Sequence, residues 1–276
     1  KGINIDTQHY IFDSVRGATK YIIGNGTNAE ATSATSLTSW NSDGFVSGSN
    51  DNLNGSGRTY VSWNWKAGTA FSNDASATSV GTIDSVGSVS ADAGFSILTW
   101  TSTQAAHTVA HGISTPAVII MKGRHEANSW QVYHHKNTAA PETDYLDLST
   151  TDATADYTVW NDTAPTSSVM SLGTWSGLDD GGTMVAYIFA EKQGYSKFGS
   201  YTGNGNADGT FVYTGFRPAW ILCKSTAATT WEMVDNKRLG YNSSNWNLFP
   251  NTTAVENADT VRLDILSNGF KIRTTG

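Results

Sequence analysis

The chain contains very little cysteine, proline and charge. Its 276 residues include 1 cysteine and 5 prolines, and charged residues make up 15% of the sequence, against about 25% in an average soluble domain. A single cysteine excludes disulfide bonds within the chain as a source of stability. The lone thiol, Cys223, follows the apolar residues 219–222, which favours a small buried side chain over a reactive nucleophile.

Positive charge and long apolar runs are also scarce. The formal net charge is −7 and the pI is about 5.2, whereas a nucleic-acid binder needs a concentrated face of lysine and arginine. No apolar run approaches the roughly 18 residues of a membrane span. We therefore expect neither a nucleic-acid partner nor membrane insertion. No signal peptide is visible and the pattern is cut at both ends, so we expect the ordered part of a longer polypeptide.

Aromatic and turn-forming residues are abundant instead. The chain holds 10 Trp, 11 Tyr, 10 Phe and 27 Gly. Aromatic and β-branched residues favour strands, and Gly, Asn and Asp favour tight turns. No long segment has an apolar period near 3.6 residues, which a helix would need. The composition therefore predicts an all-β fold.

Two stretches of the chain resemble each other at a nearly constant spacing. Residues 115–122 and 217–224 each carry a proline, then an apolar strand, then a lysine, and the two lysines lie 102 positions apart. The tryptophans that open the next strand, Trp130 and Trp231, lie 101 positions apart. A register held over about 40 residues indicates an internal repeat.

The first segment of the chain belongs to the same pattern. Asp13 and Arg16 lie 222 positions before Asp235 and Arg238. The closing run that starts at residue 59 resembles the one that starts at residue 183, which lies 124 positions later. These matches predict the C-terminal part of a first repeat at 1–68, a Ser/Ala/Gly-rich linker or hairpin at 69–94, a complete second repeat at 95–192 and the N-terminal part of a third repeat at 193–276.

Each repeat contains about seven short runs with strand character, separated by turn clusters, and no helix. This pattern predicts tandem small antiparallel β-sandwich repeats, similar to jelly rolls, of about 100 residues each. Residues 118–121 are apolar on both faces, as expected of a central strand. In 183–190 both alternating faces are apolar, which predicts burial on both sides.

Three motifs stand out in the second repeat: HGISTP at 111–116, WNDTAPTSSV at 160–169 and AYIFAE at 186–191. Together with LDILSNGFK at 263–271, they resemble the repeat domains of long tail-fibre proteins from marine and cyanobacterial phages, an uncharacterised β-sandwich repeat family. The resemblance implies a place in the virion tail fibre, outside the cell. It implies a homo-oligomer, a homotrimer in the simplest case, that contacts other tail proteins and the host surface. It supplies no catalytic residues.

Metal and catalytic sites are not indicated by the sequence. His107 and His111 are four positions apart, which on a strand places them about 13 Å apart, too far for one ion. The loop at 49–55 has oxygen ligands that suit Ca²⁺ but lacks a closing bidentate acid, so calcium is the single cofactor left open. The carboxylates Asp147, Asp152 and Asp156 show no pairing of the kind that glycosidases need. We expect no metal site and no enzyme, with a polysaccharide depolymerase as the weakest alternative.

Glycan contact requires exposed aromatic faces framed by polar side chains. Trp175 lies near Asp179 and Asp180, and Trp246 follows Asn245, so we predict these five residues as candidate glycan contacts; packing against a neighbouring subunit is the competing interpretation. Four other tryptophans have strand-like positions and are expected in the core: Trp40, Trp63, Trp130 and Trp231.

The sequence thus predicts a structural and adhesive segment of a phage tail fibre that takes part in host-surface attachment. The alternative is a glycan-binding module that recognises bacterial surface polysaccharide through many weak sites. In the third repeat, basic and acidic side chains predict ion pairs between repeats or subunits: Arg217, Arg238, Arg262 and Arg273 with Asp235, Glu256 and Asp264.

Overall fold

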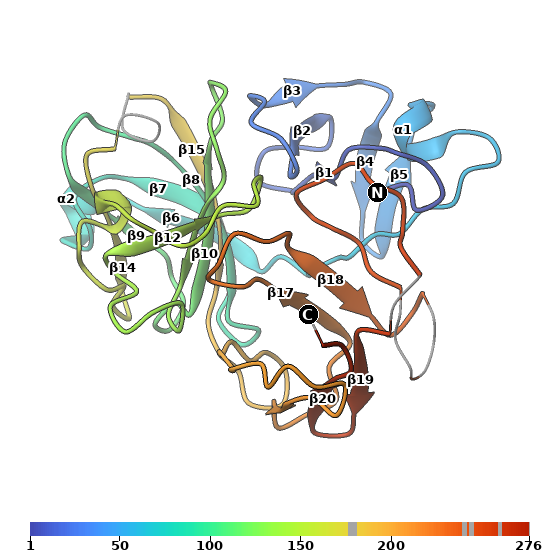
Figure 1. The fold of residues 1–276 in the computed structure, drawn as a ribbon. Helices are drawn as coiled ribbons and strands as arrows, with labels where there is room; N and C mark the ends of the chain where they lie inside the picture. Colours follow the sequence, from blue (N-terminus) through green and yellow to red (C-terminus); the bar gives the residue numbers. More distant parts are fainter. Residues whose placement is uncertain (176–180, 239–241, 243–245, 259–260, 276) are drawn as a thin grey trace.

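The protein is nearly all-β, as its composition predicts. The computed structural model describes residues 1–276 except 176–180, 239–241, 243–245, 259–260 and 276. Strands make up 35% and helices 4% of the chain, and the strands form several antiparallel sheets (Figure 1). Separate jelly-roll sandwiches of about 100 residues are not confirmed by this architecture.

The strands, in chain order, are β1 (Tyr10–Ile11), β2 (Lys20–Ile23), β3 (Ala31–Thr32), β4 (Leu37–Asn41), β5 (Gly44–Ser47), β6 (Thr69–Asn73), β7 (Ser85–Ser90), β8 (Phe95–Thr101), β9 (His107–Ala110), β10 (Val118–Gly123), β11 (Gln131–His134), β12 (Asp144–Asp147), β13 (Ala155–Asp156), β14 (Val169–Leu172), β15 (Thr183–Phe189), β16 (Phe211–Tyr213), β17 (Trp220–Cys223), β18 (Glu232–Asp235), β19 (Leu263–Leu266) and β20 (Gly269–Ile272). The short helices are α1 (Asp51–Asn54), α2 (Ala75–Thr78) and the 3-10 turn η1 (Thr158–Trp160).

The largest sheet has eight strands in the order β13-β12-β11-β10-β15-β8-β7-β6. β10 and β15 lie in its middle, and all 6 residues of β10 pair with β15. β15 contributes Met184 and Ile188 to the hydrophobic core on one face and Val185 and Tyr187 to the core on the other. Its two-sided apolar pattern therefore follows from its central place between two cores.

Residues 69–94, which the sequence predicts as a linker or a hairpin, contain β6, α2 and β7. β6 pairs with β7, with Thr69 opposite Val89, and β7 pairs with β8, with Val86 opposite Thr99. This segment thus extends the eight-stranded sheet at its edge.

Two cores stabilise the central part of the chain. One lies between the eight-stranded sheet and the β9–β14 pair and includes Met121, Trp160 and Ile188. The other lies on the opposite face of the sheet and joins distant parts of the sequence, because Ile22 and Trp231 both belong to it. The N-terminal and C-terminal segments therefore pack against the same face of the sheet (Figure 1).

Two three-stranded units in different parts of the chain have the same register. In the first, β1, β2 and β3 pair in order, with Lys20 opposite Thr32. In the second, β11, β12 and β13 pair in order, with Asp144 opposite Asp156. Each residue of the second pair lies 124 positions after its counterpart, the spacing of the closing runs in the sequence. We call these units the first and the second module.

A third unit repeats this arrangement around β18. Met233 on β18 forms an antiparallel bridge with Leu248. The corresponding pair in the first module is Ile11 opposite Ile22. We call residues 232–257 the third module.

The same backbone hydrogen bond joins each module to another one. The amide of Glu30, in the first module, donates to the carbonyl oxygen of Arg124 at 2.8 Å. The equivalent bonds, with the donor first, are Glu256 to Ile3 at 3.0 Å and Thr154 to Thr226 at 2.9 Å. Arg124, Ile3 and Thr226 lie seven, seven and six residues before the start of the second, first and third modules respectively. The three bonds therefore link the second module to the first, the first module to the third, and the third module to the second. Together they close a ring of three modules.

A buried tryptophan strengthens two of these junctions. The indole N–H of Trp130, just before the second module, donates to the carbonyl oxygen of Ile23 in the first at 2.9 Å. Trp231, just before the third module, donates to the carbonyl oxygen of Asp147 in the second at 2.8 Å. The two residues are 0% and 5% exposed. Because a buried N–H must find a partner, each indole fixes the position of the neighbouring module.

Buried lysines also reach across two of the junctions. The ammonium group of Lys122 donates to the carbonyl oxygens of Asn128, at 2.5 Å, and of Thr27 in the first module, at 3.0 Å. Lys1 occupies the equivalent place and donates to the carbonyl oxygen of Thr253 in the third module at 2.8 Å. Burial lowers the pKa of each amine to about 8. The ring is thus held by polar groups that are satisfied only when neighbouring modules are in place.

The third junction lacks this lysine contact. Lys224, the counterpart of Lys122, donates instead to the carbonyl oxygens of Ser225 and Ala227, both at 2.8 Å. The junction of the third module with the second therefore has the Trp231 indole bond and the backbone bond of Thr154, without a lysine that crosses it.

Two expectations from the sequence need correction. Trp40 is not in the core but 38% exposed, because β4 and β5 form a two-stranded sheet of their own, in which Phe45 and Val46, on opposite faces, are also exposed. The sequence predicts ion pairs between repeats or subunits for the arginines of the third repeat, but in the described part of the chain Arg238, Arg262 and Arg273 form ion pairs inside that segment. They are Arg238 with Asp235 and Glu256, Arg262 with Glu232, and Arg273 with Asp264.

Candidate functional site

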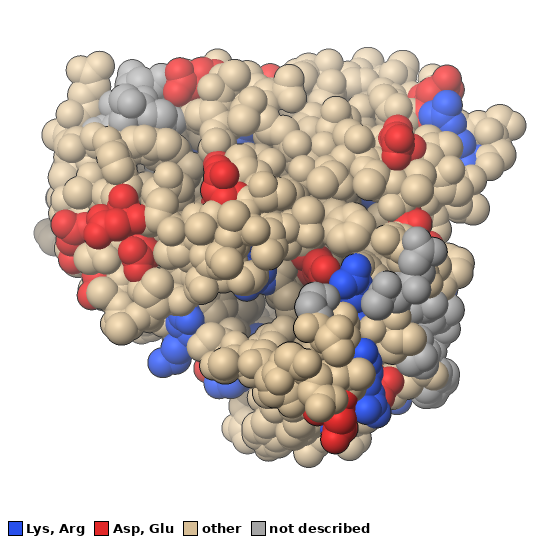
Figure 2. All heavy atoms as spheres, viewed as in Figure 1, with Lys and Arg blue, Asp and Glu red and all other residues tan. Residues whose placement is uncertain are grey.

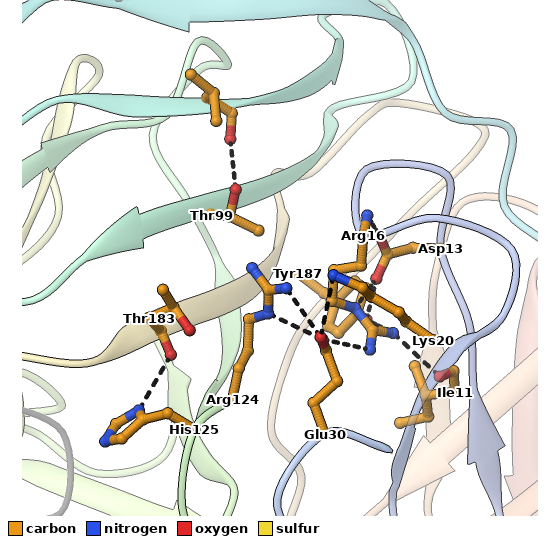
Figure 3. A network of polar contacts seen from close by, with 11 residues as sticks. Ile11, Asp13, Arg16, Lys20, Glu30, Thr99, Arg124, His125, Thr183 and Tyr187 are labelled. Atoms are coloured by element: carbon orange, nitrogen blue, oxygen red, sulfur yellow. Dashed lines mark hydrogen bonds and ion pairs between the residues drawn. The ribbon is translucent and has the colours of Figure 1, made fainter. Parts of the chain in front are cut away.

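A buried polar network connects the first module with β15 (Figure 3). Asp13 accepts hydrogen bonds from the guanidinium of Arg16 and from the hydroxyl of Tyr187, the latter at 2.7 Å. Glu30 accepts from Arg16 at 3.2 Å and from Arg124, which precedes the second module, at 2.8 Å. The network therefore links the first module to β15 and to the residues that precede the second module.

The third module contains the same network. Asp235 accepts from the guanidinium of Arg238 at 2.7 Å, and Arg238 also pairs with Glu256. The aromatic donor here is the indole of Trp63, 3.1 Å from the Asp235 carboxylate. Trp63 lies 124 positions before Tyr187, so equivalent closing runs supply the aromatic donor in both networks.

The second module has a neutral version of the network. His134 stands at the position of the aspartate, and its Nδ1 accepts from the backbone N–H of Lys136 at 3.1 Å. Thr154 donates to Asn137 at 2.9 Å in place of the glutamate–arginine pair. Burial lowers the pKa of His134 to about 4, so this side chain is uncharged at neutral pH.

These networks are built for structure and not for proton transfer. The side chains of Arg16 and Asp13 are 0% and 2% exposed, so no substrate reaches them. Burial holds the pKa of Tyr187 well above its usual value, and the carboxylate of Asp13 raises it further. A buried ion pair whose members are all hydrogen-bonded is costly to break by removing one partner. Such pairs therefore bind the modules in one arrangement.

The glycan candidate Trp175 belongs to an aromatic group at the edge of the second module. Its ring lies 6.2 Å from that of Tyr145 on β12 and 6.3 Å from that of Tyr157. Trp175 is half-buried and also packs against the core, whereas Tyr157 is 47% exposed. We call Tyr145, Tyr157 and Trp175 the aromatic edge group. The predicted partners Asp179 and Asp180 lie outside the described residues.

Carboxylates lie near the aromatic edge group. Burial raises the pKa of Tyr145, and the nearby carboxylates of Asp147 and Asp152 raise it further. Asp152 is exposed, whereas Asp144 and Asp156 lie opposite each other and point away from the face of Tyr145. An aromatic face beside carboxylate acceptors is an arrangement that can stack on a sugar ring and bind its hydroxyls.

The second glycan candidate, Trp246, is half-buried and precedes Asn247, which bridges Asn257 within the third module. Its predicted partner Asn245 lies outside the described residues. Trp246 therefore lies on the framework of the third module, and the structure does not bring it together with Trp175.

Sequence reasoning missed several exposed aromatic side chains. Trp40 packs edge-on against Phe45 at 6.3 Å on the β4–β5 hairpin. Phe211 and Tyr213 on β16 are 44% and 66% exposed. The alternation of aromatic and polar residues in these short runs was the available signal, but it indicates a strand without saying which face is covered. Figure 2 shows that much of the visible face carries neither Lys, Arg, Asp nor Glu.

No group of three or more His, Cys, Asp or Glu that suits a metal ion occurs in the described part of the chain. Among the same residues, no helix is long and apolar enough to cross a membrane. Burial raises the pKa of Cys223 to about 12, so its thiol stays protonated at neutral pH and is a poor nucleophile.

The fold and these sites define an all-β protein of antiparallel sheets, with three linked modules and exposed aromatic side chains. The chain belongs to the family DUF7483, described as a domain of unknown function, whose family model matches residues 1–276. A search of the curated proteins and a search of the solved structures each found no match.

We expect the protein to lose stability as the pH falls from 6.5 to 4. Burial lowers the pKa of His9 to about 3 and that of His111 and His134 to about 4, whereas an unfolded histidine titrates near 6.5. In this range the unfolded state binds protons that the folded state does not, so unfolding becomes more favourable. Urea unfolding at pH 7 and pH 4.5 measures the difference.

The variant His134→Asn keeps a neutral hydrogen-bonding side chain and should lose less stability between these two pH values than the wild type. The exposed His125 serves as the matched control, so His125→Asn should follow the wild type. A His134→Asn variant with the full wild-type pH dependence would show that this histidine does not carry the effect.

Proposed function

We propose that the chain is a structural and adhesive segment of a phage tail fibre that helps to attach the virion to the host surface. The observation that carries this proposal is the ring of three modules, each joined to another by the same backbone hydrogen bond. A closed ring that repeats one junction gains rigidity from a single type of contact. The exposed aromatic side chains supply surfaces on which such a rigid body can adhere.

Three finer features belong to the same proposal. The modules are parts of tandem jelly-roll-like sandwich repeats, of which the eight-stranded sheet with the β9–β14 pair represents one complete unit. The chain acts outside the cell in the virion, next to other tail proteins. It acts by binding and not by catalysis; a polysaccharide depolymerase is the weakest alternative.

We further propose that the fibre is a homotrimer. Phe211 and Tyr213 expose aromatic surface on β16, the edge strand of the β16-β20-β19 sheet. An exposed apolar edge strand is commonly covered by another chain. Light scattering of the purified chain should then give three times the mass of 29.5 kDa. A mass of one chain at all concentrations would contradict the trimer. The ring of three modules inside one chain would then be the whole assembly.

A second candidate function is the recognition of surface polysaccharide by the aromatic edge group. Its support is the partly exposed cluster of Tyr145, Tyr157 and Trp175, with the carboxylates of Asp147 and Asp152 close to Tyr145. Stacking of a sugar on one aromatic ring is weak, so many copies along a fibre would act together.

Replacing Tyr157 by alanine tests this second function. Tyr157→Ala should weaken binding of host surface polysaccharide by about fivefold or more, because an aromatic contact contributes about 1 kcal/mol, and should leave the thermal midpoint nearly unchanged. Tyr195, which is 57% exposed, provides the matched control Tyr195→Ala. Equal binding by the wild type and Tyr157→Ala would remove the aromatic edge group as the binding site.

A further inference from the structure

The connection between β10 and β11 holds a buried lysine against a buried asparagine. Lys122 is 0% exposed and Asn128 is 8% exposed. The Nζ atom of Lys122 lies 2.9 Å from the side-chain oxygen Oδ1 of Asn128, and therefore beside the carbon Cγ that carries this oxygen. Gly123 permits this approach, because a side chain there would collide with the amide nitrogen of Asn128. An amine and a carboxamide are thus packed together away from solvent.

The amine of Lys122 is also a better nucleophile than an exposed lysine at neutral pH. Burial lowers the pKa of this amine to about 8, whereas an exposed lysine titrates near 10.4. At pH 7 about one-tenth of the Lys122 side chains are therefore neutral, against less than about one-thousandth for an exposed lysine. A lysine of lowered pKa can attack a carbonyl carbon in its neutral form. An irreversible step needs only this fraction, because the protonation equilibrium refills it.

A carboxylate lies at the amide nitrogen of Asn128. The Nδ2 atom donates a hydrogen bond to Oε1 of Glu126 at 3.3 Å. Glu126 is also close enough to Lys122 for its negative charge to oppose the lowering of the lysine pKa. One carboxylate is thus near the nitrogen that would lose a proton and near the nitrogen that would gain one. A positioned carboxylate in such a role accelerates a reaction by about 10²–10⁴-fold.

The equivalent place in the first repeat has the same packing without these reactive groups. Lys1 lies 121 positions before Lys122, and its Nζ lies 3.4 Å from the hydroxyl of Thr7. Thr7 stands at the position of Asn128, and Ile5 stands at the position of the glutamate. A threonine is therefore sufficient to accept a hydrogen bond from the buried lysine. The packing alone requires neither the carboxamide nor the carboxylate of the second repeat.

We propose that Lys122 and Asn128 form an intramolecular isopeptide bond. The neutral amine attacks Cγ of Asn128, so a bond forms between Nζ and Cγ while the bond between Cγ and Nδ2 breaks. One proton moves from Nζ to Nδ2 by way of the carboxylate of Glu126, and Nδ2 leaves as ammonia. The step needs no oxidant and no further reactant. The product is a secondary amide that keeps one N–H for the carbonyl oxygen of Thr27, the present partner of the amine.

This bond turns the connection between β10 and β11 into a covalent ring of residues 122–128. Arg124 lies in that ring, and its side chain pairs with Glu30 of the first module at 2.8 Å. Its carbonyl oxygen also accepts the backbone hydrogen bond from Glu30 that joins the two modules. A covalent ring reduces the conformational freedom of the unfolded segment. The isopeptide bond therefore stabilises the segment by which the second repeat holds the first module.

Intact mass spectrometry of the purified chain tests the proposal. During incubation at pH 8 the wild type should lose about 17 Da, the mass of one ammonia molecule, relative to its sequence mass. Trypsin should then fail to cleave after Lys122, and fragmentation should find Lys122 and Asn128 in one branched peptide. A folded wild-type chain that keeps its full sequence mass after prolonged incubation would overturn the proposal.

The matched control is Asn128→Thr, which gives the second repeat the side chain that the first repeat has at this place. This variant should fold and keep its full mass, and Glu126→Gln should lose ammonia about 100-fold more slowly than the wild type. If Asn128→Thr lost ammonia as the wild type does, the loss would come from another asparagine and the isopeptide bond would be rejected. Loss at the wild-type rate in Glu126→Gln would reject the proton transfer through this carboxylate.

Discussion

The arrangement of the whole chain depends on buried and half-buried polar groups that form hydrogen bonds or ion pairs with a neighbouring module. Lys122, Trp130 and Arg124 each bond to the first module, and Lys1 and Trp63 each bond to the third. A buried donor or acceptor left without a partner costs about 1–3 kcal/mol. Separating two modules would leave several such groups without partners at once, and the free-energy costs would add up. The closed arrangement of the three modules is therefore the most stable one.

The modules resemble each other in some positions and differ in others. The first and third modules share an internal aspartate–arginine–glutamate network, whereas equivalent positions at the junctions differ, as Arg124, Ile3 and Thr226 do. The second module replaces all three charges, with His134, Asn137 and Thr154. A neutral network avoids the desolvation cost of buried charges, so the network can be exchanged as a whole but not residue by residue.

Much of the fold could be predicted from the sequence, because it depends on local composition and alternation. The all-β class follows from the aromatic and turn-forming residues, and the central position of β15 follows from its two apolar faces. The spacing of Asp13 and Arg16 from Asp235 and Arg238 predicted that these two parts of the chain are equivalent, but the sequence assigned Arg238, Asp235 and Glu256 to ion pairs between repeats or subunits and not to a network inside one module. The closure of the ring could not be predicted, because a lysine at the end of an apolar strand normally reaches solvent, whereas Lys122 is fully buried.

The candidate site was less predictable than the fold. Trp175 was identified from its loop position, but its neighbours Tyr145 and Tyr157 come from β12 and from the turn before η1. That grouping depends on how segments that are separated in the sequence pack together, and not on any local sequence pattern. Trp40 was wrongly predicted to lie in the core for a related reason. The alternation of its run predicts a strand, but not that β4 pairs with β5 alone among the described strands.

Equilibrium unfolding in urea, followed by tryptophan fluorescence and by far-ultraviolet circular dichroism, tests most directly whether the modules form one cooperative unit. The two curves should coincide, and Lys122→Met should lower their common midpoint by an amount equivalent to about 2 kcal/mol, while the exposed control Lys136→Met leaves it unchanged. Two separate transitions, with Lys122→Met affecting one of them, would contradict the ring as the element that holds the structure together.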